Sequence, residues 1–96
     1  MNEIKYKTLI LDQDQKLCKV DEEEVNLTKK EYELLLLFLT QPNKIHTREE
    51  IMKAICDKPI TSETVNVNIN RLRKKLGKYN KNLITRSGFG YGFKII

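Results

Sequence analysis

A segment in the second half of the chain, residues 62–77, predicts an amphipathic helix with well-marked ends. Ser62 suits the N-cap position, because its hydroxyl can accept a hydrogen bond from an amide of the first turn. Gly77 stands where helices commonly end in a left-handed conformation. Apolar residues recur between them at spacings of four, three and four, which places them on one stripe: Val65, Ile69, Leu72 and Leu76. This stripe requires a core on one side of the helix.

The opposite arc of this helix is polar and basic. It presents Glu63, Val67, Asn70, Arg71 and Lys74, and its flanks carry Asn66, Asn68, Arg73 and Lys75. Arg and Asn can pair bidentately with guanine and adenine edges in the DNA major groove, and Val can contact a thymine methyl group. Many helices with a basic outer face are only solvated, so this segment alone leaves that alternative open.

The charge of the whole chain favours the DNA interpretation. The formal net charge is +5 over 96 residues, but it is unevenly distributed. Residues 1–27 carry four basic and seven acidic side chains, whereas residues 61–96 carry eight basic side chains against Glu63 alone. A positive field confined to one end predicts a polyanionic partner at that end.

The cysteine and histidine content and the hydropathy of the chain limit which other kinds of protein it can be. Cys18, Cys56 and the single histidine, His46, cannot supply a four-ligand zinc site, so no metal or cofactor is expected. Two reduced thiols are favoured over a disulfide, and His46 is expected at the surface. The longest apolar run, residues 34–39, is too short to span a bilayer, and no signal peptide opens the chain. We therefore expect a cytoplasmic protein.

The pattern along the chain predicts strands, then helices, then a hairpin. Short strands are expected at residues 7–11, 17–20 and 24–27. Thr28 and Glu31 have capping-box spacing before a leucine-rich core helix, which residues 41–43 end. Thr47 and Glu50 repeat this spacing before a second helix that ends near Cys56.

The C-terminal part completes the pattern. Pro59, in the short connection at residues 57–61, separates the second helix from the third. A polar loop at residues 78–82 and strands at residues 83–87 and 91–95 follow, with a tight turn between the strands. Phe89 in that turn could pack on the third helix or point at DNA, and packing is favoured; Tyr91 and Phe93 are expected to be core residues. The order predicts an α+β winged helix-turn-helix domain over residues 1–96, with an N-terminal antiparallel sheet.

These segments together resemble the C-terminal effector domain of OmpR/PhoB-type response regulators. The resemblance covers essentially the whole chain. Its strongest parts are Leu27-Thr28 to Glu31, Thr47 to Ile51, Thr64 to Gly77, and Ile84 to Tyr91. It implies a fourth N-terminal strand, either at residues 3–6 or as a longer first strand. It also implies that the third helix enters the major groove and that the hairpin reaches the minor groove.

The resemblance also assigns roles to individual residues. It implies base contacts from Asn66, Val67, Asn68, Asn70 and Arg71. It implies phosphate contacts from Thr64, Arg73 and Lys74, to which the basic pattern adds Lys75 and Lys78. The wing would be formed by Arg86, Ser87, Gly88 and Gly90.

Further partners follow from the same resemblance. Such regulators carry a receiver domain served by a sensor kinase, and these 96 residues resemble the effector domain without it. They bind direct repeats in double-stranded DNA as tandem dimers, and the isolated domain is expected to be a monomer. In such families the connection before the third helix can contact RNA polymerase.

The chain departs from the family pattern at several positions. Many members have Asp where Asn66 stands and Arg where Ser87 stands, so Arg86 would have to supply the wing contact. Asn68 and Asn70 replace the His and Arg common in some members. The connection at residues 57–61 is short and has no aromatic residue, which weakens the expectation of a polymerase contact.

The leading hypothesis is therefore sequence-specific binding of duplex DNA by a transcriptional regulator. The alternative is a winged helix that docks an acidic protein partner, since fold alone does not decide function. Arg71 with several asparagines on one arc discriminates between them, because an acidic partner needs charge but no amide groups. An enzyme is not expected, because the acidic residues lie away from the basic face.

Overall fold

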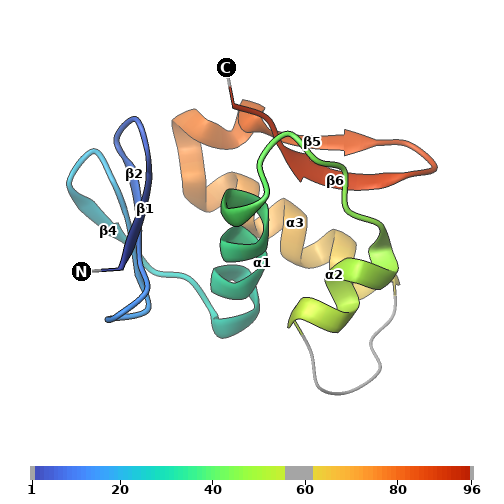
Figure 1. The fold of residues 1–96 in the computed structure, drawn as a ribbon, viewed down its shortest axis with the longest axis horizontal. Coiled ribbons are helices and arrows are strands. Elements are labelled where there is room, and N and C mark those ends of the chain that lie inside the picture. The colour runs from blue at the N-terminus through green and yellow to red at the C-terminus, as the bar shows by residue number, and fades with distance from the viewer. Residues whose placement is uncertain (1, 56–61, 96) are drawn as a thin grey trace.

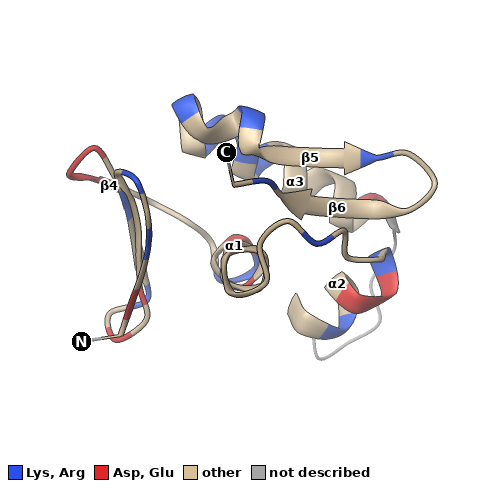
Figure 2. Cartoon of the chain, turned by 45° about the horizontal axis from the view of Figure 1, so that its top comes forward, with Lys and Arg blue, Asp and Glu red and all other residues tan. Residues whose placement is uncertain are grey.

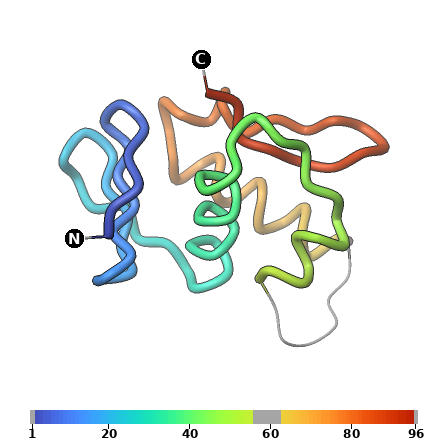
Figure 3. The backbone as a smooth tube through the Cα atoms, viewed as in Figure 1, coloured from blue at the N-terminus to red at the C-terminus, as the bar shows by residue number. Residues whose placement is uncertain are grey.

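The computed structural model describes residues 2–55 and 62–95. In these residues the chain forms an N-terminal sheet, then helices, then a C-terminal hairpin (Figure 1). Helix α1 (Lys29–Thr40) lies between the sheet and the other helices, and it packs against α2 (Arg48–Ile55), α3 (Ser62–Leu76) and the hairpin. The backbone tube shows the sheet on one side of α1 and the hairpin and α2 on the other, with α3 crossing behind α1 (Figure 3). This arrangement confirms the predicted winged helix-turn-helix.

The N-terminal sheet is an antiparallel meander of β1 (Glu3–Tyr6), β2 (Leu9–Asp12), β3 (Leu17–Val20) and β4 (Glu23–Val25). The separate strand implied at residues 3–6 is present. The strand predicted at residues 7–11 begins only at Leu9, because Lys7 adopts a left-handed turn conformation with φ of 55°. The strand predicted at residues 24–27 lies at Glu23–Val25 instead.

The capping signals correctly predicted where α1 and α2 begin. The Thr28 side chain accepts a hydrogen bond from the Glu31 amide, and the Glu31 carboxylate accepts one from the Thr28 amide. The Thr47 hydroxyl accepts from the Glu50 amide at the start of α2. Side chains within three positions fix both helix starts, so the sequence alone was enough to predict them.

Helix α3 has the predicted buried stripe and the predicted end. Val65, Ile69, Leu72 and Leu76 are all nearly inaccessible, and they join the core formed by Phe38, Ile51 and their neighbours. Gly77 adopts φ of 55° directly after the helix. The helix begins at Ser62 itself; the Ser62 side chain, Cys56 and the predicted connection at residues 57–61 lie outside the described structure.

The segment after α3 differs from its prediction. Residues Gly77–Asn82 form a 3₁₀ helix, η1, rather than a polar loop. Tyr79 is buried there and is hydrogen-bonded to the Thr8 amide at 2.8 Å and to the Thr8 hydroxyl. Asn82 is also buried, and it donates to the Lys94 carbonyl at 2.7 Å. Partners 71 positions away order this polar segment, and no local pattern reveals them.

The wing is the hairpin of β5 (Leu83–Arg86) and β6 (Gly90–Phe93). Both strands are shorter than predicted, and Tyr91 and Phe93 are core residues as expected. Phe89, by contrast, is 70% exposed at the hairpin tip, so the prediction that it packs on α3 is wrong.

The base of the wing is joined by backbone to the segment before α2. The His46 amide donates to the Tyr91 carbonyl at 2.7 Å, and the Tyr91 amide donates to the His46 carbonyl at 3.0 Å. His46 is therefore fully buried, with its ring 5.6 Å from that of Phe38, and the expectation of a surface residue is wrong. A Cβ atom at Gly90 would overlap the His46 carbonyl oxygen, and one at Gly92 would overlap that of Lys44.

Candidate nucleic-acid interface

The outward arc of α3 carries the residues that were predicted to face a ligand. Asn70, Arg71 and Lys74 are exposed, and Val67 is 40% exposed. Arg71 and Lys74 have no hydrogen bond or ion pair with any residue that the structure describes. The core side of the helix fixes this arc in place, so two cations, an amide and a methyl-bearing side chain project together.

Asn66 is bonded to the wing directly, whereas Asn70 is bonded to Arg73, a residue of α3 that itself contacts the wing. The Asn66 Oδ1 atom accepts a hydrogen bond from the Tyr91 hydroxyl of β6. The Asn70 Oδ1 atom accepts one at 3.4 Å from the guanidinium of Arg73. In both asparagines the carbonyl oxygen thus accepts a hydrogen bond from a protein donor, although both residues remain exposed.

Arg73 connects α3 to the first wing strand. Its Nε donates to the Leu83 carbonyl at 3.1 Å, and its Nη2 donates to the Thr85 hydroxyl at 2.6 Å. The guanidinium is thus already engaged by protein groups, and sequence reasoning had assigned it to phosphate. We place it among the residues that position the interface.

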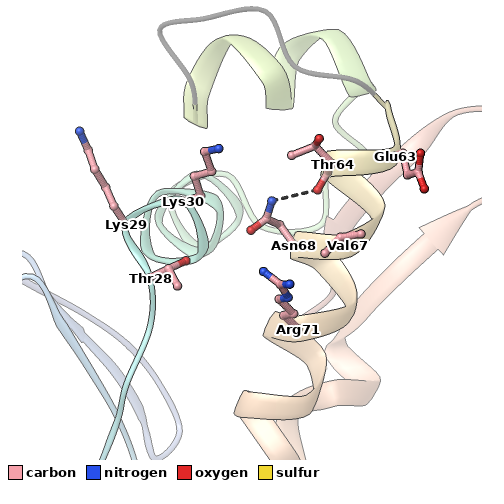
Figure 4. Close-up of a pocket in the computed structure, with 8 residues that line it drawn as sticks. All are labelled: Thr28, Lys29, Lys30, Glu63, Thr64, Val67, Asn68 and Arg71. Atoms are coloured by element: carbon pink, nitrogen blue, oxygen red, sulfur yellow. Dashed lines mark hydrogen bonds between the residues drawn. The ribbon is translucent and has the colours of Figure 1, made fainter.

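Asn68 lies in a different environment from the other asparagines of α3. It is only 6% exposed, and its amide donates to the Thr64 carbonyl at 2.9 Å, one turn earlier (Figure 4). Asn68 lines the same open pocket as Arg71, but it is more enclosed and its amide nitrogen is already bonded within the helix. A base contact from Asn68 therefore stays a prediction, and it would require this nitrogen to give up its bond to Thr64.

Lys75 forms an ion pair inside the domain. Its Nζ lies 2.6 Å from Oε1 of Glu31, whose side chain is fully buried at the start of α1. Burial alone would raise the pKa of Glu31, but the hydrogen bonds from Lys75 and from the Thr28 amide more than offset it. The pKa of Glu31 is therefore below its ordinary value, and Lys75 joins α3 to α1.

Lys78 is likewise paired within the protein. Its Nζ lies 2.8 Å from Oδ1 of Asp21, in the turn between β3 and β4. The hydrogen bond from Lys78 lowers the pKa of Asp21 and raises that of Lys78. This pair connects η1 to the acidic sheet, and the phosphate role of Lys78 stays a prediction.

The wing residues lie at the hairpin tip. Arg86, Ser87 and Gly88 are exposed, together with Phe89, whereas Gly90 is buried against His46. The hairpin carries no acidic residue, and acidic side chains are concentrated in the N-terminal sheet and the first turn of α2 (Figure 2). No acidic side chain of the hairpin would therefore repel a polyanion at the tip.

Two lysines of α1 join this face, and sequence reasoning missed them. Lys29 and Lys30 line an open pocket of about 550 Å³ together with Thr28 and residues of α3, including Arg71 (Figure 4). A signal was available in the sequence. Basic residues in the first turn of a helix are disfavoured by its dipole, so two of them there indicate some other use.

The described residues offer neither a metal-ion cluster nor a membrane-spanning helix. Residues 2–55 and 62–95 contain no cluster of three or more histidine, cysteine, aspartate or glutamate side chains suited to a metal ion. The same residues contain no helix long and apolar enough to cross a membrane. Cys18 is a buried free thiol, and burial raises its pKa to about 11.

Comparison with known proteins identifies the family. The family model described as "Transcriptional regulatory protein, C terminal" matches residues 22–93. The chain therefore belongs to this family, and the OmpR/PhoB resemblance is confirmed.

Individual relatives support the same assignment. The transcriptional regulatory protein SrrA of Staphylococcus aureus (strain NCTC 8325 / PS 47) is 36% identical over 98 residues; the match covers 96% of this chain and 41% of SrrA. This chain thus spans about two fifths of the length of that relative.

Solved structures match the fold closely. The DNA-binding domain of response regulator AdeR, solved in complex with an intercistronic region, has a TM-score of 0.87 at 30% identity, covering 96% of this chain and 99% of that domain. DrrB, a Thermotoga maritima OmpR/PhoB homologue, has a TM-score of 0.87 at 25% identity, covering 96% of this chain and 44% of DrrB.

Proposed function

We propose that the chain binds duplex DNA with sequence specificity, as the output domain of a two-component response regulator that controls transcription. The observation that carries this proposal is the exposed arc of α3, where Arg71 and Lys74 project with no described protein partner. The family match and the DNA complex of the AdeR domain support it.

The contacts divide into two kinds. Arg71 reads a base edge, assisted by Asn66, Val67 and Asn70, because Arg and Asn can discriminate base pairs in the major groove. The phosphates are held by residues that set orientation without reading sequence: Thr64, Lys74, Lys29, Lys30 and, from the wing, Arg86.

Assembly and partners are part of the same proposal. One small domain buries too little interface for high affinity alone, so two copies would bind direct repeats side by side while the isolated chain stays monomeric. A receiver domain, its sensor kinase and a cytoplasmic location follow from response-regulator function. An RNA polymerase contact through residues 57–61 concerns a segment outside the described structure.

The test is selection of random duplex DNA by the purified chain at about physiological salt, followed by sequencing. Enrichment of a short motif, repeated at about one helical turn, is expected. Arg71→Ala is the matched control, since it should relax one position of that motif. Retention without enrichment would contradict sequence specificity, and no retention at all would favour docking of an acidic protein instead.

A further inference from the structure

The Tyr91 side chain is fixed before it meets Asn66. Tyr91 is 3% exposed, its backbone is paired with that of His46 in both directions, and the Arg48 guanidinium lies 5.9 Å from its ring centroid. The hydroxyl that donates to Asn66 Oδ1 therefore comes from a side chain with little freedom to move. The Asn66 amide group is planar, so a fixed oxygen also fixes the direction of its NH₂ group.

A related arrangement occurs one helical turn later, where the donor belongs to α3 itself and is bonded to the wing. Arg73 is anchored to the Leu83 carbonyl and the Thr85 hydroxyl of β5, and it donates to Asn70 Oδ1. No residue in the described part of the chain accepts a hydrogen bond from Nδ2 of Asn66 or of Asn70. In both asparagines the oxygen is directed to a wing-anchored donor, and the NH₂ group is left available.

We propose that the wing determines which bases α3 selects, by holding Asn66 and Asn70 with their NH₂ donors outward. This inference rests on the proposed DNA-binding function. An outward NH₂ group matches base edges rich in acceptors, above all guanine with N7 and O6. Bidentate pairing with adenine needs the amide oxygen and nitrogen together, so it would require Asn66 to give up the bond from Tyr91. Tyr91 and Arg73 are thus positioning residues for specificity.

The choice of asparagine rather than aspartate at position 66 determines which hydrogen-bonding group faces the DNA. An aspartate at this position would accept the same bond from Tyr91 with one oxygen and present its second oxygen outward. That oxygen accepts but cannot donate, so it matches the amino groups of cytosine or adenine. One substitution at position 66 should then reverse the hydrogen-bonding preference while the fold stays the same.

The experiment is selection and sequencing with the wild type and three variants. Asn66→Ala identifies the base pair that Asn66 reads. At that pair the wild type should prefer guanine on one strand by about tenfold. Tyr91→Phe, which retains the ring but removes the donor, should reduce that preference to about threefold or less and leave the other positions unchanged. Asn66→Asp should move the preference to a pair that offers an amino group on the contacted strand.

Controls separate this effect from loss of folding or of binding. Thermal melting of Tyr91→Phe defines a temperature at which the variant is folded, and selection is done below it. Lys74→Met should weaken all sequences alike without altering any base preference. An unchanged motif in Tyr91→Phe, or adenine selected by wild-type Asn66, would overturn this inference alone. No motif for the wild type would overturn the proposed function itself.

Discussion

Two neighbouring lysines of α3 show how differently the two sides of one helix use the same residue type. Lys74 is exposed and has no partner in the described structure, whereas Lys75 forms a 2.6 Å ion pair with the buried Glu31. One residue step turns a side chain by about 100° around a helix, and that rotation separates a lysine with no described partner from one that is paired with α1. Net charge therefore overstates the number of cations available to a ligand.

The largest effect should come from removing the ion pair between Lys75 and Glu31. Lys75→Met should lower the free energy of unfolding by about 2–3 kcal/mol, because it leaves a buried carboxylate without its counter-charge. Urea unfolding measures this difference. Lys74→Met is the matched control and should change stability by less than about 0.5 kcal/mol. Equal stability of the two variants would show that Lys75 does not stabilise the fold more than Lys74 does.

The pH dependence of folding stability should further distinguish Lys75 from Lys74. The pKa of Glu31 is lowered in the folded state from an ordinary value of 4.5, because the bonds from Lys75 and Thr28 outweigh burial. The ion pair therefore stabilises the fold above about pH 4.5, and this contribution is lost as the pH falls through the lower folded-state pKa. The stability gap between the wild type and Lys75→Met should shrink over that acidic window in a series of unfolding curves. A gap that stays constant with pH would exclude Glu31 as the cause.

On the interface side, Arg71→Ala should have the greatest effect. We expect a loss of about 2 kcal/mol in affinity for the selected motif, together with relaxed preference at one base pair. Titration of labelled motif and single-base variants measures both quantities. If affinity falls but every base preference survives, Arg71 is a phosphate contact rather than a reading residue.

Lys74→Met should have a smaller and more uniform effect on binding. One phosphate contact fewer should reduce the slope of log affinity against log salt by about one unit for every sequence tested. Lys75→Met, assayed at a temperature where it is folded, should retain the wild-type slope. If Lys75→Met lowered the slope and Lys74→Met did not, then Lys75 rather than Lys74 would be the phosphate contact.

The smallest effect is expected from Lys78→Ala. Lys78 is paired with Asp21 at the junction of η1 and the sheet, so its loss should leave the salt slope unchanged. The same titrations provide the measurement. A reduced slope would show that Lys78 leaves Asp21 to contact DNA.

Sequence reasoning predicted the features that are encoded locally. The cap at Thr28, the stripe containing Leu72 and the left-handed Gly77 each depend on residues within a few positions, so they appear as spacing patterns. The partner of Lys75 is 44 positions away, and the burial of His46 depends on backbone pairing with Tyr91. Such long-range partners decide which predicted site residues remain available. Phe89 is the opposite case, because packing on the third helix was favoured over an outward position and the side chain is 70% exposed.

The close seating of Gly90 and Gly92 on the segment before α2 has a consequence for DNA shape. With no room for a side chain at these positions, the wing has a fixed attachment, and Arg73 fixes its other strand to α3. The distance between α3, which would enter the major groove, and the wing tip, which would reach the minor groove, is then set before binding. DNA would have to bend or twist to match it, and that deformation costs more for stiff sequences than for flexible ones. We therefore expect two operators that share every contacted base to be bound differently when the steps between those bases differ in flexibility.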